Sequence, residues 1–172
     1  MTASTSTQKL LIQLETALHR LVESFWEEPY RYFTESDAVT SLWQWFATRP
    51  GLARVDKTKD GFETGLLHRE YPTFFRLDDS NPTERLGPPA RRGYYDLVLI
   101  NPSYIEGHCA EVVHNRNIRW QGDLSSPPLL AAVEFKLLAR TWKPENDTNV
   151  RQELGKLRLA QESPADVSAD YM

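Results

Sequence analysis

Two short apolar runs, each interrupted by one acid, constrain the fold of this chain more than any other feature. Residues 94–100 read Tyr-Tyr-Asp-Leu-Val-Leu-Ile, and residues 129–135 read Leu-Leu-Ala-Ala-Val-Glu-Phe. Runs that are apolar at nearly every position are typical of strands covered on both faces. A charge inside such a strand is costly unless it is paired or binds a cation. The sequence therefore predicts two central strands that carry Asp96 and Glu134.

Two amphipathic helices and a pair of shorter strands are expected before these runs. Apolar residues recur every three or four positions from Leu10 to Phe25, which predicts a helix. Thr34 and Asp37 have the spacing of a capping box, so a second helix should begin there. Residues 53–55 and 66–71 are candidate strands around a turn. The order of elements therefore predicts an α/β domain.

Composition narrows the class of protein. The 172 residues suit one domain, which we expect over residues 10–172 after a flexible tail at 1–9. The longest apolar runs fall far short of the roughly 20 residues of a membrane helix, and no signal peptide is recognisable, so we expect a cytoplasmic protein without membrane contact. A single cysteine, Cys109, excludes an internal disulfide. The net charge of −4 argues against a protein that coats nucleic acid.

The two acids and a nearby lysine suggest one chemistry. Glu134 and Lys136 are two residues apart and share a strand face, and Asp96 lies beside Glu134 if the two strands are neighbours. Two adjacent carboxylates repel each other, and a divalent cation between them relieves that repulsion. Oxygen ligands favour Mg²⁺ or Mn²⁺. The ammonium of Lys136 could orient a water molecule, which is what metal-assisted phosphodiester hydrolysis requires.

At this point the sequence resembles the PD-(D/E)XK nuclease superfamily. Asp96, a spacer of a few dozen residues, and Glu134-Phe135-Lys136 at the end of an apolar strand match its motif, over roughly residues 30–160. The resemblance implies a restriction-endonuclease-like fold, with a central mixed β-sheet flanked by helices. It also implies a Mg²⁺- or Mn²⁺-dependent nuclease. Glu35, at the start of the capped helix, matches the superfamily's third acid, so the implied metal ligands are Glu35, Asp96 and Glu134.

Further residues are candidates for supporting the site or contacting nucleic acid. Glu70 lies on the strand expected before the Asp96 strand, while Gln152 and Lys156 lie on the helix expected after Lys136. Arg92 belongs to a set of basic residues in the loops that flank the two acidic strands: Arg85, Arg91, Arg92, Arg116, Arg119, Arg140 and Lys143. These residues favour nucleic acid as the partner, DNA rather than RNA. A homo-oligomer is also compatible with the sequence.

For each of these residues, a role without catalysis or metal binding is an open alternative. Asp96 and Glu134 could form structural salt bridges, Glu35 could be only an acid favoured by the helix dipole, and Lys136 could be only a solvated lysine. For the whole chain, the alternative is a catalytically inactive nuclease-like module that binds DNA or a protein. The net negative charge favours that alternative. So does the last core strand of the superfamily, which would begin near Tyr171, where the chain stops.

Overall fold

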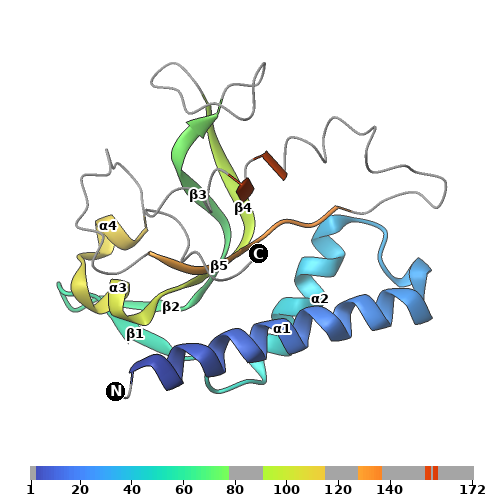
Figure 1. The fold of residues 1–172 in the computed structure, drawn as a ribbon, viewed down its shortest axis with the longest axis horizontal. Coiled ribbons are helices and arrows are strands. Elements are labelled where there is room, and N and C mark those ends of the chain that lie inside the picture. The colour runs from blue at the N-terminus through green and yellow to red at the C-terminus, as the bar shows by residue number, and fades with distance from the viewer. Residues whose placement is uncertain (1–2, 78–90, 115–127, 137–153, 156, 159–172) are drawn as a thin grey trace.

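Helices surround two small antiparallel sheets (Figure 1). The computed structural model describes residues 3–77, 91–114, 128–136, 154–155 and 157–158. Helices in the described ranges include α1 (Ala3–Glu27), the 3-10 helix η1 (Pro29–Arg31), α2 (Glu35–Ala47), α3 (Pro102–Gly107) and α4 (Ala110–Val113). The strands are β1 (Val55–Lys57), β2 (Glu63–Gly65), β3 (Leu67–Leu77), β4 (Arg91–Ile100) and β5 (Leu129–Val133). The expected α/β class is confirmed.

The larger sheet has the order β3-β4-β5, and the smaller one pairs β1 with β2. In the larger sheet Leu67 lies opposite Leu99, and Leu97 lies opposite Val133. The run at 94–100 is the central strand of this sheet, as expected. Every pairing among the described strands is antiparallel, so the expected mixed sheet is not seen in this part of the chain. Within the same part β5 pairs with β4 alone, and it occupies an edge rather than the expected central place.

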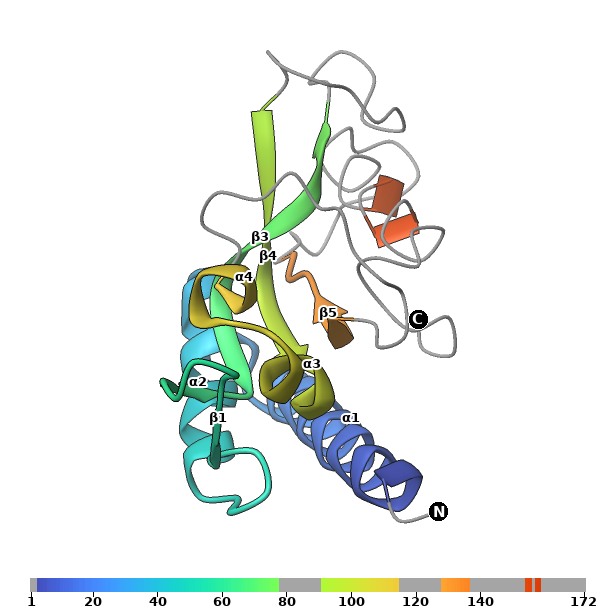
Figure 2. The same cartoon turned by 90° about the vertical axis from the view of Figure 1, so that its left-hand side faces the viewer.

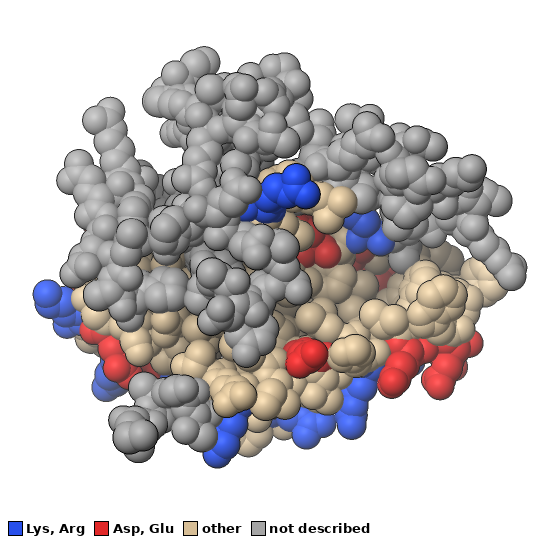
Figure 3. Space-filling model, in the orientation of Figure 1, with Lys and Arg blue, Asp and Glu red and all other residues tan. Residues whose placement is uncertain are grey.

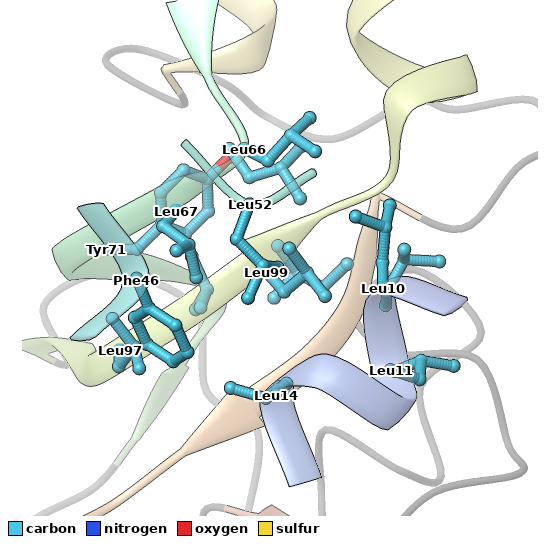
Figure 4. Packing of buried hydrophobic residues seen from close by; sticks show 14 of the residues in the cluster. Leu10, Leu11, Leu14, Phe46, Leu52, Leu66, Leu67, Tyr71, Leu97 and Leu99 are labelled. Atoms are coloured by element: carbon cyan, nitrogen blue, oxygen red, sulfur yellow. The ribbon is translucent and has the colours of Figure 1, made fainter. Parts of the chain in front are cut away.

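The core is built on both faces of β4. Leu97 and Leu99 alternate with Val98 and Ile100, and all four are at most 1% exposed. Leu10 and Leu14 of α1 and Phe46 of α2 pack in the same cluster as Leu97 and Leu99 (Figure 4). Burial of these side chains is the main favourable contribution to folding, because each fully buried Leu or Phe contributes roughly 1.5–3 kcal/mol.

The elements are arranged around this core in a clear order. Figure 1 shows α1 running along the base of the molecule, with α2 packed beside it. In Figure 2, β3 and β4 continue beyond the helices as a twisted ribbon. The β1–β2 hairpin is joined to the short helices, because Asp60 Oδ1 accepts from the Ala110 N–H at 2.9 Å. None of the helices in the described ranges combines the length and apolar character that crossing a bilayer requires.

Two elements extend beyond their expected bounds. Helix α1 begins at Ala3, within the segment for which we expected a flexible tail. Once a helix is nucleated, extending it by one residue costs little free energy, because each added residue also forms a hydrogen bond. The helix nucleated by the apolar stripe from Leu10 to Phe25 therefore extends back to Ala3. Strand β3 continues past Pro72, and its register shifts between Pro72 and Arg76. A proline is tolerated there because β3 lies at an edge of the described sheet.

The central place of β4 predicts a sharp contrast between two substitutions. Leu99→Ala, at a side chain that is 0% exposed, should lower the free energy of unfolding by about 2–5 kcal/mol. Ile12→Ala, at a side chain that is 53% exposed, should change it by less than about 0.5 kcal/mol. Urea denaturation of both variants measures the two values. Equal effects would contradict the placement of the core.

Candidate functional site

The start of α2 is fixed by a capping box. Asp37 N donates to Thr34 Oγ1 at 3.2 Å, and Thr34 N donates back to Asp37 Oδ2 at 2.9 Å. The backbone N–H groups of Thr34 and then Phe33 stabilise the carboxylate and lower the pKa of Asp37 below its ordinary value of 3.8. The sequence predicted this cap correctly. The cap sets the first turn of α2, and Glu35 is the first helical residue.

Two side-chain contacts join this first turn to the larger sheet. Lys136 Nζ donates to Glu35 Oε2 at 3.4 Å, across 101 positions of sequence. Arg69 Nη2, on β3, donates to Ser36 Oγ at 3.3 Å. The Lys136 and Glu35 side chains are 28% and 39% exposed, so this ion pair lies at the surface. In Figure 3, red and blue side chains lie together near the middle of the visible face, where Figure 1 places the end of β5 and the start of α2.

Asp96 and Glu134 lie where the pairing of β4 with β5 ends. The last pair of the register at that end is Leu97 with Val133, and Asp96 and Glu134 are the next residues of the two chain segments. Asp96 Oδ2 accepts a hydrogen bond from the Phe135 N–H at 2.7 Å, so its carboxylate reaches the backbone between Glu134 and Lys136. The Oε1 atom of Glu134 is excluded from solvent.

The expected site residues therefore form two adjacent pairs. Asp96 and Glu134 are the residues that directly follow the last β4–β5 pair, and Glu35 contacts Lys136 at the start of α2. The run 134–136 and the Phe135–Asp96 hydrogen bond connect the two pairs. Among the described residues, however, no three His, Cys, Asp or Glu side chains lie close enough to hold a metal ion. The expected cluster of three carboxylates is thus not assembled there.

Two carboxylates still fit a magnesium site in their donor chemistry. Mg²⁺ is commonly held by one or two carboxylates and keeps several waters, which substrate phosphates partly replace. Asp96 and Glu134 offer oxygen ligands, as that type of site requires. Glu35, whose Oε2 accepts from Lys136, is placed to hold the lysine rather than the ion.

The remaining candidates are only partly described. Glu70 lies on β3 between Arg69, which pairs with Leu97, and Tyr71, which pairs with Tyr95, so it stands opposite Asp96. Its φ of 52° is left-handed, a conformation that costs an ordinary residue about 1–2 kcal/mol. Gln152 and Lys156 lie outside the described residues, and so do the loop residues of the basic set.

Sequence reasoning missed two contacts that shape this site. The Phe135 backbone N–H leaves no trace in a side-chain pattern, because any residue could supply it. The Arg69–Ser36 hydrogen bond joins residues of unremarkable type across 33 positions. For Arg92 the structure describes the backbone, which pairs with Arg76 in the β3–β4 ribbon, at the far end of β4 from Ile100.

Comparison of the chain with protein-family models, curated proteins and solved structures finds no match.

The cap of α2 predicts a pH-dependent contribution to stability. Because the pKa of Asp37 is lowered in the folded chain, its ionised form stabilises α2 above pH 3.8, and this contribution is lost as the pH falls through the lowered value. Asp37→Asn keeps an acceptor oxygen but removes the charge. Urea denaturation should show the parent more stable than the variant near neutral pH. That difference should shrink below pH 3.8, and a constant difference would contradict the role of the charge.

Proposed function

We propose that this chain is a divalent-metal-dependent nuclease that hydrolyses phosphodiester bonds of nucleic acid, with a restriction-endonuclease-like fold. One observation carries this function. The structure brings Lys136 to Glu35 at 3.4 Å, while Asp96 contacts the backbone of Phe135 at 2.7 Å. Three stretches that are far apart in the sequence, at Glu35, Asp96 and residues 134–136, thus meet around the end of one strand, with the acids and the lysine that the reaction needs.

Asp96 and Glu134 are the proposed metal ligands. A bound Mg²⁺ or Mn²⁺ would supply Lewis-acid polarisation of the phosphoryl oxygen and lower the pKa of a bound water. The hydrogen bond from the Phe135 N–H fixes one oxygen of Asp96 and leaves lone pairs on the carboxylate for a cation. Both side chains project from backbone in or directly beside the sheet, which holds them more rigidly than a loop would.

Lys136 and Glu35 form the second part of the proposed site. The Lys136 ammonium has three N–H donors, and Glu35 accepts from it at 3.4 Å. A contact of this kind restricts where the ammonium can lie, and its proposed role is to orient a water molecule or a phosphoryl oxygen beside the acids. Glu35 therefore acts as a positioning residue for Lys136, a role that differs from the metal ligand implied by the resemblance.

A catalytically inactive module is the second candidate, and one observation favours it. In the described part of the chain no third acid joins Asp96 and Glu134 closely enough to hold a metal. In that case the Glu35–Lys136 pair would only fasten α2 to β5, and Asp96 would only cap the end of β5. The two candidates make opposite predictions for metal binding and for cleavage.

Cleavage and metal binding test the proposed reaction together. With Mg²⁺ or Mn²⁺, the protein should cut at least one of four substrates: single- or double-stranded DNA or RNA. Lys136→Ala and Asp96→Asn should each lower the rate at least about hundredfold, the scale at which a positioned proton-transfer group or charge contributes. By calorimetry, Asp96→Asn should bind Mn²⁺ more weakly. Lys136→Ala should bind it equally or more tightly, because a neighbouring positive charge is gone.

Matched controls separate these effects from general damage. Lys57→Ala and Glu63→Gln alter exposed residues of the β1–β2 sheet, and neither should change cleavage or Mn²⁺ affinity. A parent protein that binds Mn²⁺ but cuts none of the four substrates would favour the inactive module. A folded parent that neither binds Mn²⁺ nor cleaves would contradict the nuclease.

A further inference from the structure

A second group of polar side chains surrounds Trp45, near the other end of α2. The guanidinium carbon of Arg49 lies 4.3 Å from the centre of the Trp45 ring, and that of Arg20, on α1, lies 5.7 Å from it. Two cations therefore share one aromatic ring where α1 and α2 pack together. A cation over the face of an indole is attracted by the ring's quadrupole, which explains why each arginine is held there.

Neither arginine is neutralised by an acid in the part of the chain that the structure describes. The described ion pairs of α1, η1 and β1 join His19 to Glu15, Arg31 to Glu28 and Arg54 to Asp56, and they leave Arg20 and Arg49 out. Two like charges near one ring repel each other, and the aromatic ring offsets this only in part. The pair is therefore a local positive centre in a chain whose net charge is −4.

Buried donors at the same place also lack an acceptor. Arg49 Nε and Trp45 Nε1 are excluded from solvent, and neither has a hydrogen-bond partner among the described residues. A buried donor without an acceptor is destabilising, so two of them beside two cations is an unusual arrangement. Gln13, seven positions before Arg20 on α1, lies against Gly51, since a Cβ on Gly51 would stand 3.0 Å from Gln13 Oε1. Helix α1 is therefore closely packed against the residues that follow α2.

We propose that Arg20, Trp45 and Arg49 form a binding site for a phosphate group. Guanidinium groups bind phosphate oxygens in a planar, bidentate manner, so Arg20 and Arg49 supply the donors, and the indole of Trp45 holds the two guanidinium groups near each other. A phosphate supplies the negative charge that the two arginines lack, together with several acceptor oxygens. A carboxylate ligand offers fewer acceptor oxygens for the same two cations, so phosphate is the better match.

This site is separate from the carboxylates of the proposed nuclease. Trp45 lies about 15 Å along the axis of α2 from Glu35, at 1.5 Å per residue. The phosphate site uses no residue of the other group, so it stands whether or not the chain cuts nucleic acid. The phosphate could belong to a nucleic-acid backbone or to a small phosphate compound, which share this chemistry.

The indole N–H of Trp45 reports binding directly. In ¹H–¹⁵N spectra of the full chain, with the peak assigned through Trp45→Phe, titration with inorganic phosphate should move that peak saturably. Sodium chloride at matched ionic strength should not. A second titration uses a short single-stranded oligodeoxynucleotide. Tighter binding of the oligonucleotide through the same peak would identify a nucleic-acid backbone as the source of the phosphate, whereas equal or weaker binding would identify a small phosphate compound.

Variants of Arg49 test the proposed phosphate site. Arg49→Gln should weaken binding of inorganic phosphate at least about tenfold, because a charge-assisted bidentate contact is lost. Arg49→Lys keeps the charge without the planar fork and should give an intermediate affinity, which protects the test if Arg49→Gln does not fold. Arg31→Gln, at an exposed arginine that pairs with Glu28, should match the parent. No saturable shift with either probe, or equal affinities for Arg49→Lys, Arg31→Gln and the parent, would overturn the phosphate site.

Discussion

The burial of β4 on both faces is the constraint on which the rest of this structure depends. Its residues 97–100 are at most 1% exposed, and they contact leucines of α1 and Phe46 of α2 within one cluster. A strand this apolar is stable only when other elements cover it, so helices and neighbouring strands must assemble around it. Asp96 lies in the same strand, directly before Leu97, at the point where the pairing with β5 ends while the pairing with β3 continues.

The end of the pairing with β5 explains why the candidate site lies where it does. Strand β5 ends at Val133, and the backbone N–H of Phe135 finds its acceptor in the Asp96 carboxylate at 2.7 Å instead of in a neighbouring strand. Lys136 then reaches the first turn of α2, which the capping box of Thr34 and Asp37 holds in place. The short stretch 134–136 thus connects the sheet to α2 and carries residues of the proposed site. A substitution in the sheet or in the first turn of α2 should therefore also alter the site.

Local patterns predicted the parts of this structure that depend on local physics. The apolar run at 94–100, the capping box at Thr34 and the leucine stripe of α1 each imply their element directly. The resemblance placed Glu35 and Lys136 in one site, with Glu35 as a metal ligand, but it did not predict the contact between them, which joins residues 101 positions apart. The Phe135–Asp96 hydrogen bond and the Arg20–Trp45–Arg49 group could not be predicted. They depend on how helices and strands pack, and their residue types are common on any protein surface.

The position of a bound metal tests the central claim most directly. Crystals grown with Mn²⁺ and measured for anomalous scattering locate the ion without any assumption about activity. We expect a peak between the carboxylates of Asp96 and Glu134, which disappears in Asp96→Asn, while Lys136 remains beside Glu35. A peak at other side chains, or none at a Mn²⁺ concentration far above that of the protein, would contradict the proposed metal site.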